Sequence, residues 1–205
     1  MKEQKTQATK VNIKADENAK AASAIDSGSN FYGLTNDYMF KVIMQENVYV
    51  REMLIRALLG LDEEELTYSE VLNPIIPGYA IDNKTCILDL NLMLNNKEKL
   101  NLEMQVIKDQ AWEKRSLYYW ARNYADLKAG NNYAELKRTT HIGILDHTPV
   151  SEHPEFYSRY ELRNIRSNRT YSDVIDIRTL DLTRVDLAYP EEYGIAYWAK
   201  IIKAA

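Results

Sequence analysis

Apolar positions begin to repeat along the chain only after residue 30. Residues 1–30 carry few bulky apolar side chains, so they cannot bury enough surface to offset the entropy of ordering. We therefore expect a disordered N-terminal tail, with a short basic arm that contacts phosphate as the alternative. An N-cap signal at 35–37 precedes apolar residues at helical spacing, and a second helical run covers 48–59 before Gly60. The folded part is thus predicted to start with two helices.

Two strongly β-prone runs follow these helices. Residues 85–94 are apolar with Asp89 in the middle, and residues 100–107 alternate between apolar and polar side chains. The residues between them, 95–98, favour a turn, so the two runs are predicted to pair as an antiparallel hairpin. The segment 68–74 is predicted to be extended just before this hairpin.

The second half of the chain mixes helical and strand-like patterns. A helix is predicted over 110–128, strands over 139–145, 156–165 and 170–182, and a last helix over 193–202. This order of elements predicts an α/β fold with a mixed central β-sheet flanked by helices. We expect residues 31–184 to form the core domain and residues 185–205 to form a C-terminal helix. Whether the native chain extends past Ala205 is left open.

Composition and charge narrow the classes of function. The net charge is −4 and the pI is near 5.5, which counts against a passive nucleic-acid coat but not against an acidic metal site. The single cysteine, Cys86, excludes an intrachain disulfide and a cysteine-based zinc cluster. The polar start of the chain predicts no signal peptide, and no apolar run reaches the roughly 18 residues of a membrane span. We expect a cytoplasmic protein with no membrane partner.

Two acidic residues are predicted to face each other on the hairpin. If Asn91 pairs near Asn101, strand alternation places Asp89 and Glu103 opposite each other on the polar face. Two carboxylates that close repel unless a cation lies between them or one binds a proton. They are either solvent-exposed charges or, if the helix over 110–128 covers this face, ligands of a hard cation such as Mg²⁺.

Five segments of the sequence resemble a known group of nucleases. They are 36–41 (NDYMFK), 87–90 (ILDL), 102–105 (LEMQ), 115–119 (RSLYY) and 141–146 (HIGILD). In this order they resemble the PD-(D/E)xK nuclease superfamily, and more closely the bacterial recombination-promoting nuclease / putative transposase family. The resemblance covers residues 31–184 and implies a restriction-endonuclease-like core.

The resemblance also implies roles for individual residues. Asp89 and Glu103 correspond to the ligands of Mg²⁺, for which Mn²⁺ substitutes, and the backbone carbonyl of Met104 corresponds to a third ligand. Gln105 stands where the superfamily most often has lysine, at the position that holds the attacking water. A neutral amide can orient a water but cannot stabilise hydroxide as an ammonium does.

Four further residues are candidates for the same site. Lys41, in the first helix, is either an exposed charge or a replacement for the missing lysine, and Glu46 is a candidate extra acid. Arg115 and Tyr119 share a face of the helix over 110–128 and are predicted to lean over Gln105 and bind phosphate. The alternative is an arginine that only packs against neighbouring aromatic rings.

The remaining titratable groups receive more ordinary interpretations. His141 lies in a predicted buried strand, which is typical of a hydrogen-bonded core histidine. Six arginines in the last part of the chain form either a phosphate-binding track or ion pairs with nearby acids. They are Arg159, Arg163, Arg166, Arg169, Arg178 and Arg184.

The predicted function is Mg²⁺-dependent endonucleolytic hydrolysis of DNA, linked to recombination or mobile elements. The alternative is a catalytically weak nuclease-fold module that binds nucleic acid or a partner protein, and a third interpretation is a regulator that acts by protein contact. The choice between DNA and RNA, sequence preference, nicking or double-strand cleavage, formation of a homodimer and the activity that Gln105 permits are left open.

Overall fold

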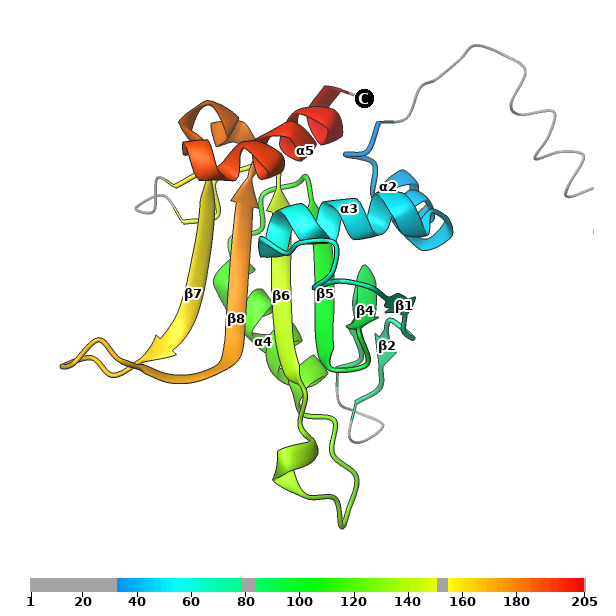
Figure 1. Cartoon of the computed structure of the whole chain (residues 1–205), viewed down its shortest axis with the longest axis vertical. Helices are drawn as coiled ribbons and strands as arrows, with labels where there is room; N and C mark the ends of the chain where they lie inside the picture. The colour runs from blue at the N-terminus through cyan, green and yellow to red at the C-terminus, as the bar shows by residue number, and fades with distance from the viewer. Residues whose placement is uncertain (1–32, 79–83, 151–154, 205) are drawn as a thin grey trace, which may run out of the picture. The chain divides into compact units, whose positions relative to one another are not determined.

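The computed structural model describes residues 33–78, 84–150 and 155–204 (Figure 1). The tail predicted for residues 1–30 lies outside the described residues. Within the described part, no helix is long and apolar enough to cross a membrane.

The described residues build a six-stranded mixed β-sheet with the order β1-β4-β5-β6-β8-β7. The central strands β5, β6 and β8 run parallel, whereas β1 and β4 on one side and β7 on the other are antiparallel to their neighbours. The bounds are β1 (Ser69–Val71), β4 (Leu90–Leu94), β5 (Glu98–Gln105), β6 (Arg138–Leu145), β7 (Tyr157–Arg163) and β8 (Thr170–Asp181). The mixed central sheet predicted from the sequence is confirmed.

Helices cover both faces of this sheet (Figure 1). Helices α2 (Asp37–Glu46), α3 (Val48–Leu59) and α5 (Tyr193–Ala204) pack on one face, and α4 (Trp112–Tyr124) lies on the other. Asn36 and Asn47 cap the first two helices through their side chains, and Gly60 ends α3 at φ +71°, in the left-handed region that glycine adopts without strain. Short 3-10 turns complete the chain: η1 (Tyr133–Glu135), η2 (Leu182–Leu187) and η3 (Pro190–Glu192).

The single strand predicted over 85–94 was wrong. The run divides into β3 (Cys86–Ile87), which pairs with β2 (Ile75–Ile76) in a small second sheet, and β4 in the main sheet. The backbone N–H of Leu88 donates to the carbonyl of Pro74, so the first half of the run follows a different partner. Apolar periodicity does not encode which strand each half will pair with.

The predicted pairing of the hairpin is confirmed, since Asn91 lies opposite Asn101. Asn95 and Asn96 make the turn at φ +47° and +58°, a conformation that asparagine tolerates. Strand β5 starts at Glu98 and stops at Gln105, so it begins and ends earlier than the predicted run over 100–107.

The helix predicted over 110–128 is shorter than expected: α4 runs from Trp112 to Tyr124, and a tertiary contact binds its last turn. Lys99, which projects from β5, donates through Nζ to the carbonyl of Asn123 at 3.0 Å and to Asp126 Oδ2 at 2.8 Å. A cation on the last carbonyls of a helix is favourable and closes the last turn. The lysine comes from a strand that lies 24 residues earlier, so local sequence gave no sign of it.

Candidate active site

Asp89 and Glu103 meet near the C-terminal end of β5, where α4 reaches Glu103 through Arg115. Asp89 directly precedes β4, and Leu90 of β4 lies opposite Leu102 of β5, so the next pair along the hairpin brings Asp89 beside Glu103. Asp89 Oδ2 accepts a hydrogen bond from the backbone N–H of Met104 at 3.0 Å. The break between β3 and β4 thus places a carboxylate against the backbone of β5.

Glu103 is fully buried and incompletely paired. Its Oε1 accepts a hydrogen bond from Arg115, whereas its Oε2 has no hydrogen-bond partner among the described residues. Burial, and then the negative charge of Asp89, raise the pKa of Glu103 to about 7, although the Arg115 charge opposes the shift. Without a further cation, this side chain therefore holds a proton through much of the acidic range.

The two carboxylates each face one cation, and the two cations come from opposite sides of the sheet. Lys41 of α2 places Nζ 3.0 Å from Asp89 Oδ1, and Arg115 of α4 forms the ion pair with Glu103. Arg115 also contacts Asp109 Oδ2 at 3.4 Å, and its guanidinium lies 5.2 Å from the centre of the Tyr119 ring. Two helices far apart in the sequence thus converge on one acidic pair.

Gln105 is held in one orientation beside this pair. Its Oε1 accepts from Arg115 Nη1 at 3.0 Å, and its Nε2 donates to the carbonyl of Ile107 at 2.8 Å. Arg115 therefore leans over Gln105, as the helical spacing predicted.

The family described as PD-(D/E)XK nuclease family transposase matches residues 34–205. The chain belongs to this family. No curated protein and no solved structure matches the chain.

Membership of the PD-(D/E)XK family explains the architecture around the acidic pair. The six-stranded mixed sheet with flanking helices is consistent with the PD-(D/E)XK nuclease fold. The match reaches Ala205, beyond the range over which the five segments resemble the family, and it includes α5, whose Ile195, Trp198 and Ile202 belong to the main core. PD-(D/E)XK nucleases generally use divalent metals, and a nuclease family implies DNA as substrate.

The donor atoms present at the pair fit such a metal. The Oε2 of Glu103 is a buried carboxyl oxygen with no hydrogen-bond partner among the described residues, so it is available as a metal donor. The N–H of Met104 points to Asp89, so strand alternation directs the Met104 carbonyl to the same side. No group of three or more His, Cys, Asp or Glu side chains suited to a metal occurs in the described ranges. The oxygen donors that the acidic pair offers are two carboxylates and the Met104 carbonyl. Mg²⁺ commonly binds through one or two carboxylates and completes its shell with water.

Two further candidates, Tyr119 and Glu46, differ in whether they contact the residues around Asp89 and Glu103. Tyr119 lies beside Arg115, as expected. Glu46 is exposed at the end of α2, and no hydrogen bond or ion pair of the described residues connects it to Asp89 or Glu103. Its role as an extra acid stays a prediction.

Sequence reasoning missed two groups of the site. Asp109 provides a second acid for Arg115, and Asn101 donates from Nδ2 to Nδ1 of the buried His141 at 2.9 Å. Burial, and then the Arg115 charge, lower the pKa of His141 to about 3, so this histidine is neutral. The prediction of a buried histidine is confirmed and its Nδ1 is hydrogen-bonded, but its Nε2 has no hydrogen-bond partner among the described residues. Asn101 lies two residues before Glu103 in β5, so both side chains are on the same face of the strand. Strand alternation could therefore have identified Asn101 from the sequence.

The raised pKa of Glu103 predicts how stability depends on pH in the metal-free protein. The folded state binds this proton more tightly than the unfolded state, so protonation of Glu103 stabilises the fold. This stabilisation is complete below pH 4.5 and is lost as the pH rises to about 7. The loss is up to about 3 kcal/mol in the free energy of unfolding. Urea unfolding in EDTA at pH 5 and pH 8 measures it.

Glu103→Gln provides the control for this pH dependence, since its side chain does not titrate. The difference in unfolding free energy between the native chain and the variant should change between the two pH values. If it stays constant, Glu103 does not carry the proton.

Proposed function

We propose that this chain is a metal-dependent endonuclease that hydrolyses DNA phosphodiester bonds at the Asp89–Glu103 site, as part of recombination or the movement of mobile elements in the cytoplasm. The observation that carries the proposal is the buried Glu103 carboxylate, with one unpartnered oxygen, beside Asp89. We infer Mg²⁺ as the ion, with Mn²⁺ as a substitute, because all the available donors are hard oxygen atoms.

Asp89, Glu103 and the carbonyl of Met104 would hold the ion. A bound divalent ion acidifies a water and offsets negative charge on the phosphoryl group. The charges of the site support this. With Asp109 included, three carboxylates face the two cations Lys41 and Arg115, which leaves an excess of one negative charge. A divalent ion reverses that excess to one positive charge, which matches a single phosphodiester.

The chain's own groups orient the reactants. Gln105, held between Arg115 and a backbone carbonyl, can position the attacking water through its amide. Lys41 brings an ammonium to the acidic pair from another element, so it can supply the charge that the superfamily usually places at the Gln105 position. Arg115 and Tyr119 form the wall that would contact the phosphate backbone.

The test is cleavage of supercoiled plasmid by the purified chain in Mg²⁺, in Mn²⁺ and in EDTA. Cleavage is expected with either metal and none in EDTA, and nicked and linear products distinguish single-strand from double-strand cleavage. Cleavage that continues unchanged in EDTA would refute the metal-dependent mechanism.

The alternative is a catalytically weak module that binds nucleic acid or a partner protein, and one observation favours it. Lys41 and Arg115 each form an ion pair with one of the two carboxylates, so both members of the acidic pair have a cationic partner without a metal. Such a module should retain its DNA affinity in EDTA, and it should not cleave DNA in Mg²⁺ or in Mn²⁺. Filter binding measured beside the plasmid assay separates the two functions.

A further inference from the structure

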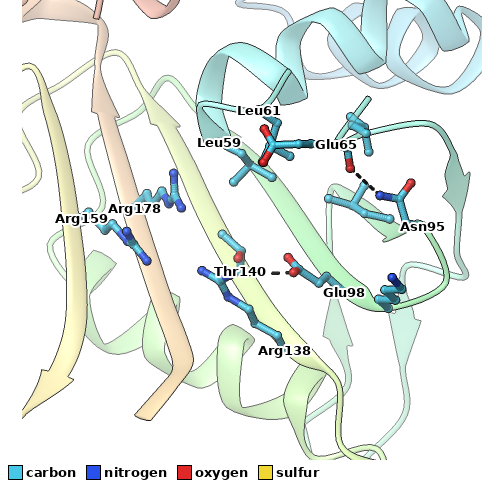
Figure 2. A pocket seen from close by; sticks show the side chains of 12 residues that line it. Leu59, Leu61, Glu65, Asn95, Glu98, Arg138, Thr140, Arg159 and Arg178 are labelled. Atoms are coloured by element: carbon cyan, nitrogen blue, oxygen red, sulfur yellow. Dashed lines mark hydrogen bonds and ion pairs between the residues drawn. The ribbon is translucent and has the colours of Figure 1, made fainter. Parts of the chain in front are cut away.

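A second hollow lies on the face of the sheet opposite the acidic pair. Along β6, His141 faces α4, so its neighbour Thr140 points to the other face. Thr140 lines a hollow of about 530 Å³ that opens between the loop after α3 and strands β5 to β8 (Figure 2). This volume is in the range of small-molecule binding sites.

The two walls of the hollow differ in chemistry. Apolar side chains from the end of α3, the loop after it and β4 form one wall: Leu59, Leu61, Leu66 and Leu94. Figure 2 shows the opposite side, where three arginines from three adjacent strands surround Thr140. They are Arg138 of β6, Arg159 of β7 and Arg178 of β8. A molecule that fills the hollow would meet apolar surface and guanidinium groups together.

The three arginines share one carboxylate. Asp176 of β8 is fully buried, and its Oδ2 lies 2.9 Å from Arg138 Nη2, 3.2 Å from Arg159 Nη2 and 2.8 Å from Arg178 Nη2. Burial alone would raise the pKa of Asp176, but hydrogen bonds and charge from Arg178, and then the charges of Arg159 and Arg138, hold that pKa below its ordinary value. The aspartate is therefore ionised, and its single negative charge is paired with three positively charged arginines.

Arg178 alone is sufficient to pair with this aspartate. It forms a two-point contact with Asp176 through Nε at 2.9 Å and Nη2, and its Nη1 donates to the carbonyl of Leu58 at 2.9 Å. Its donors are thus used within the protein. A buried carboxylate with this fork already has a complete partner, which leaves Arg138 and Arg159 in excess.

The donors of the other two arginines are less completely used. Arg138 Nε is buried with no hydrogen-bond partner in the described part of the chain, and Arg138 Nη1 is 3.8 Å from Glu98, too far for a hydrogen bond. Arg159 contacts Asp176 through Nε at 3.3 Å and Nη2 at 3.2 Å, both longer than the contacts of Arg178, and its side chain is 47% exposed at the rim. The lining holds Lys97 and the three arginines against Glu65 and Glu98, and one positive charge remains in excess even when the buried Asp176 is counted with the acids.

We propose that this hollow binds a phosphate group joined to a planar or apolar moiety, as in a nucleoside monophosphate. The phosphate would contact Arg138 and Arg159, and the ring would lie against the leucine wall. A guanidinium fork matches the geometry of phosphate oxygens. The same chemistry has two sources, a free nucleotide or the phosphorylated end of a nucleic-acid strand. The site is separate from Asp89 and Glu103, which lie on the other face.

Isothermal titration calorimetry of the full chain tests this site with adenosine monophosphate, adenosine and inorganic phosphate, all in EDTA. The monophosphate should bind at least about tenfold more tightly than either fragment, because only it contacts both walls. Arg138→Gln and Arg159→Gln should each weaken its binding about tenfold. Arg159→Lys should recover part of the affinity, since it keeps the charge but not the fork.

Arg163→Gln is the matched control, because Arg163 is on the same strand as Arg159 but pairs with Glu161 outside the hollow. The melting temperature of each variant verifies that it folds, and Asp176 retains Arg178 in both. The proposal is overturned if wild-type chain binds no phosphate compound at millimolar concentration, or if the glutamine variants bind as wild type does. It is also overturned if Asp89→Ala removes the binding, which would place the phosphate at the acidic site.

Short oligonucleotides distinguish the two sources of phosphate. If a 5′-phosphorylated oligonucleotide competes with the monophosphate and its 5′-hydroxyl counterpart does not, the ligand is a strand end. If neither competes, the ligand is a free nucleotide. Both results retain the phosphate site, and neither depends on cleavage at the acidic pair.

Discussion

Asp89→Ala and Glu103→Ala are each expected to abolish metal-dependent DNA cleavage. Changes to groups that merely orient a metal ligand commonly cost 10–100-fold, so the loss of a ligand should cost at least about 100-fold. Initial rates of plasmid cleavage at saturating Mg²⁺ measure this effect. Glu64→Gln, which neutralises an exposed carboxylate in the loop after α3, is the control and should cleave as the native chain does.

Thermal unfolding in EDTA separates a catalytic role from a structural one. Either alanine variant removes one of two carboxylates that repel each other, and Arg115 keeps Gln105 and Asp109 as partners. Both variants are therefore expected to fold with melting temperatures close to that of the native chain. A variant that fails to fold would make the pair structural, and a variant that still cleaves would remove Asp89 or Glu103 from the mechanism.

Gln105→Lys is expected to lower the cleavage rate about tenfold or more, although lysine is the common residue of the superfamily at this position. In this chain the Gln105 amide oxygen accepts from Arg115 at 3.0 Å, so an ammonium there would face a guanidinium. Two like charges about 4 Å apart repel by roughly 4 kcal/mol at an effective dielectric constant near 20. The lysine would be displaced from the position that we propose orients the attacking water.

The double variant Gln105→Lys/Arg115→Gln is expected to recover that loss. The new ammonium can pair with Glu103 in place of Arg115, and the repulsion is absent. A well-placed charge of this kind is worth on the order of 100-fold in rate, so the double variant should equal or exceed the native chain. Single-turnover rates of the native chain, Gln105→Lys, Arg115→Gln and the double variant form a double-mutant cycle that measures this effect. A gain in the single variant would show that Arg115 leaves Gln105 when substrate binds.

Local sequence was sufficient for most elements and for the central pair. Helical spacing and cap residues predicted α2 and α3, and strand alternation placed Glu103 on the polar face of β5. The pairing of Asn91 with Asn101 followed from a turn of four residues. These features depend on interactions among close neighbours in the chain, which periodicity and turn chemistry report directly.

The partners of the site residues were decided only by the tertiary structure. Lys41 reaches Asp89 from 48 positions away in the sequence. The ion pairs foreseen as one interpretation of the late arginines do form, since Arg163 pairs with Glu161 and Arg184 with Asp181. Arg138 and Arg159 converge on one aspartate only because β8 lies between β6 and β7. Strand order follows from how the whole core packs, so alternation within a single strand shows which face a side chain takes but not which groups meet it there.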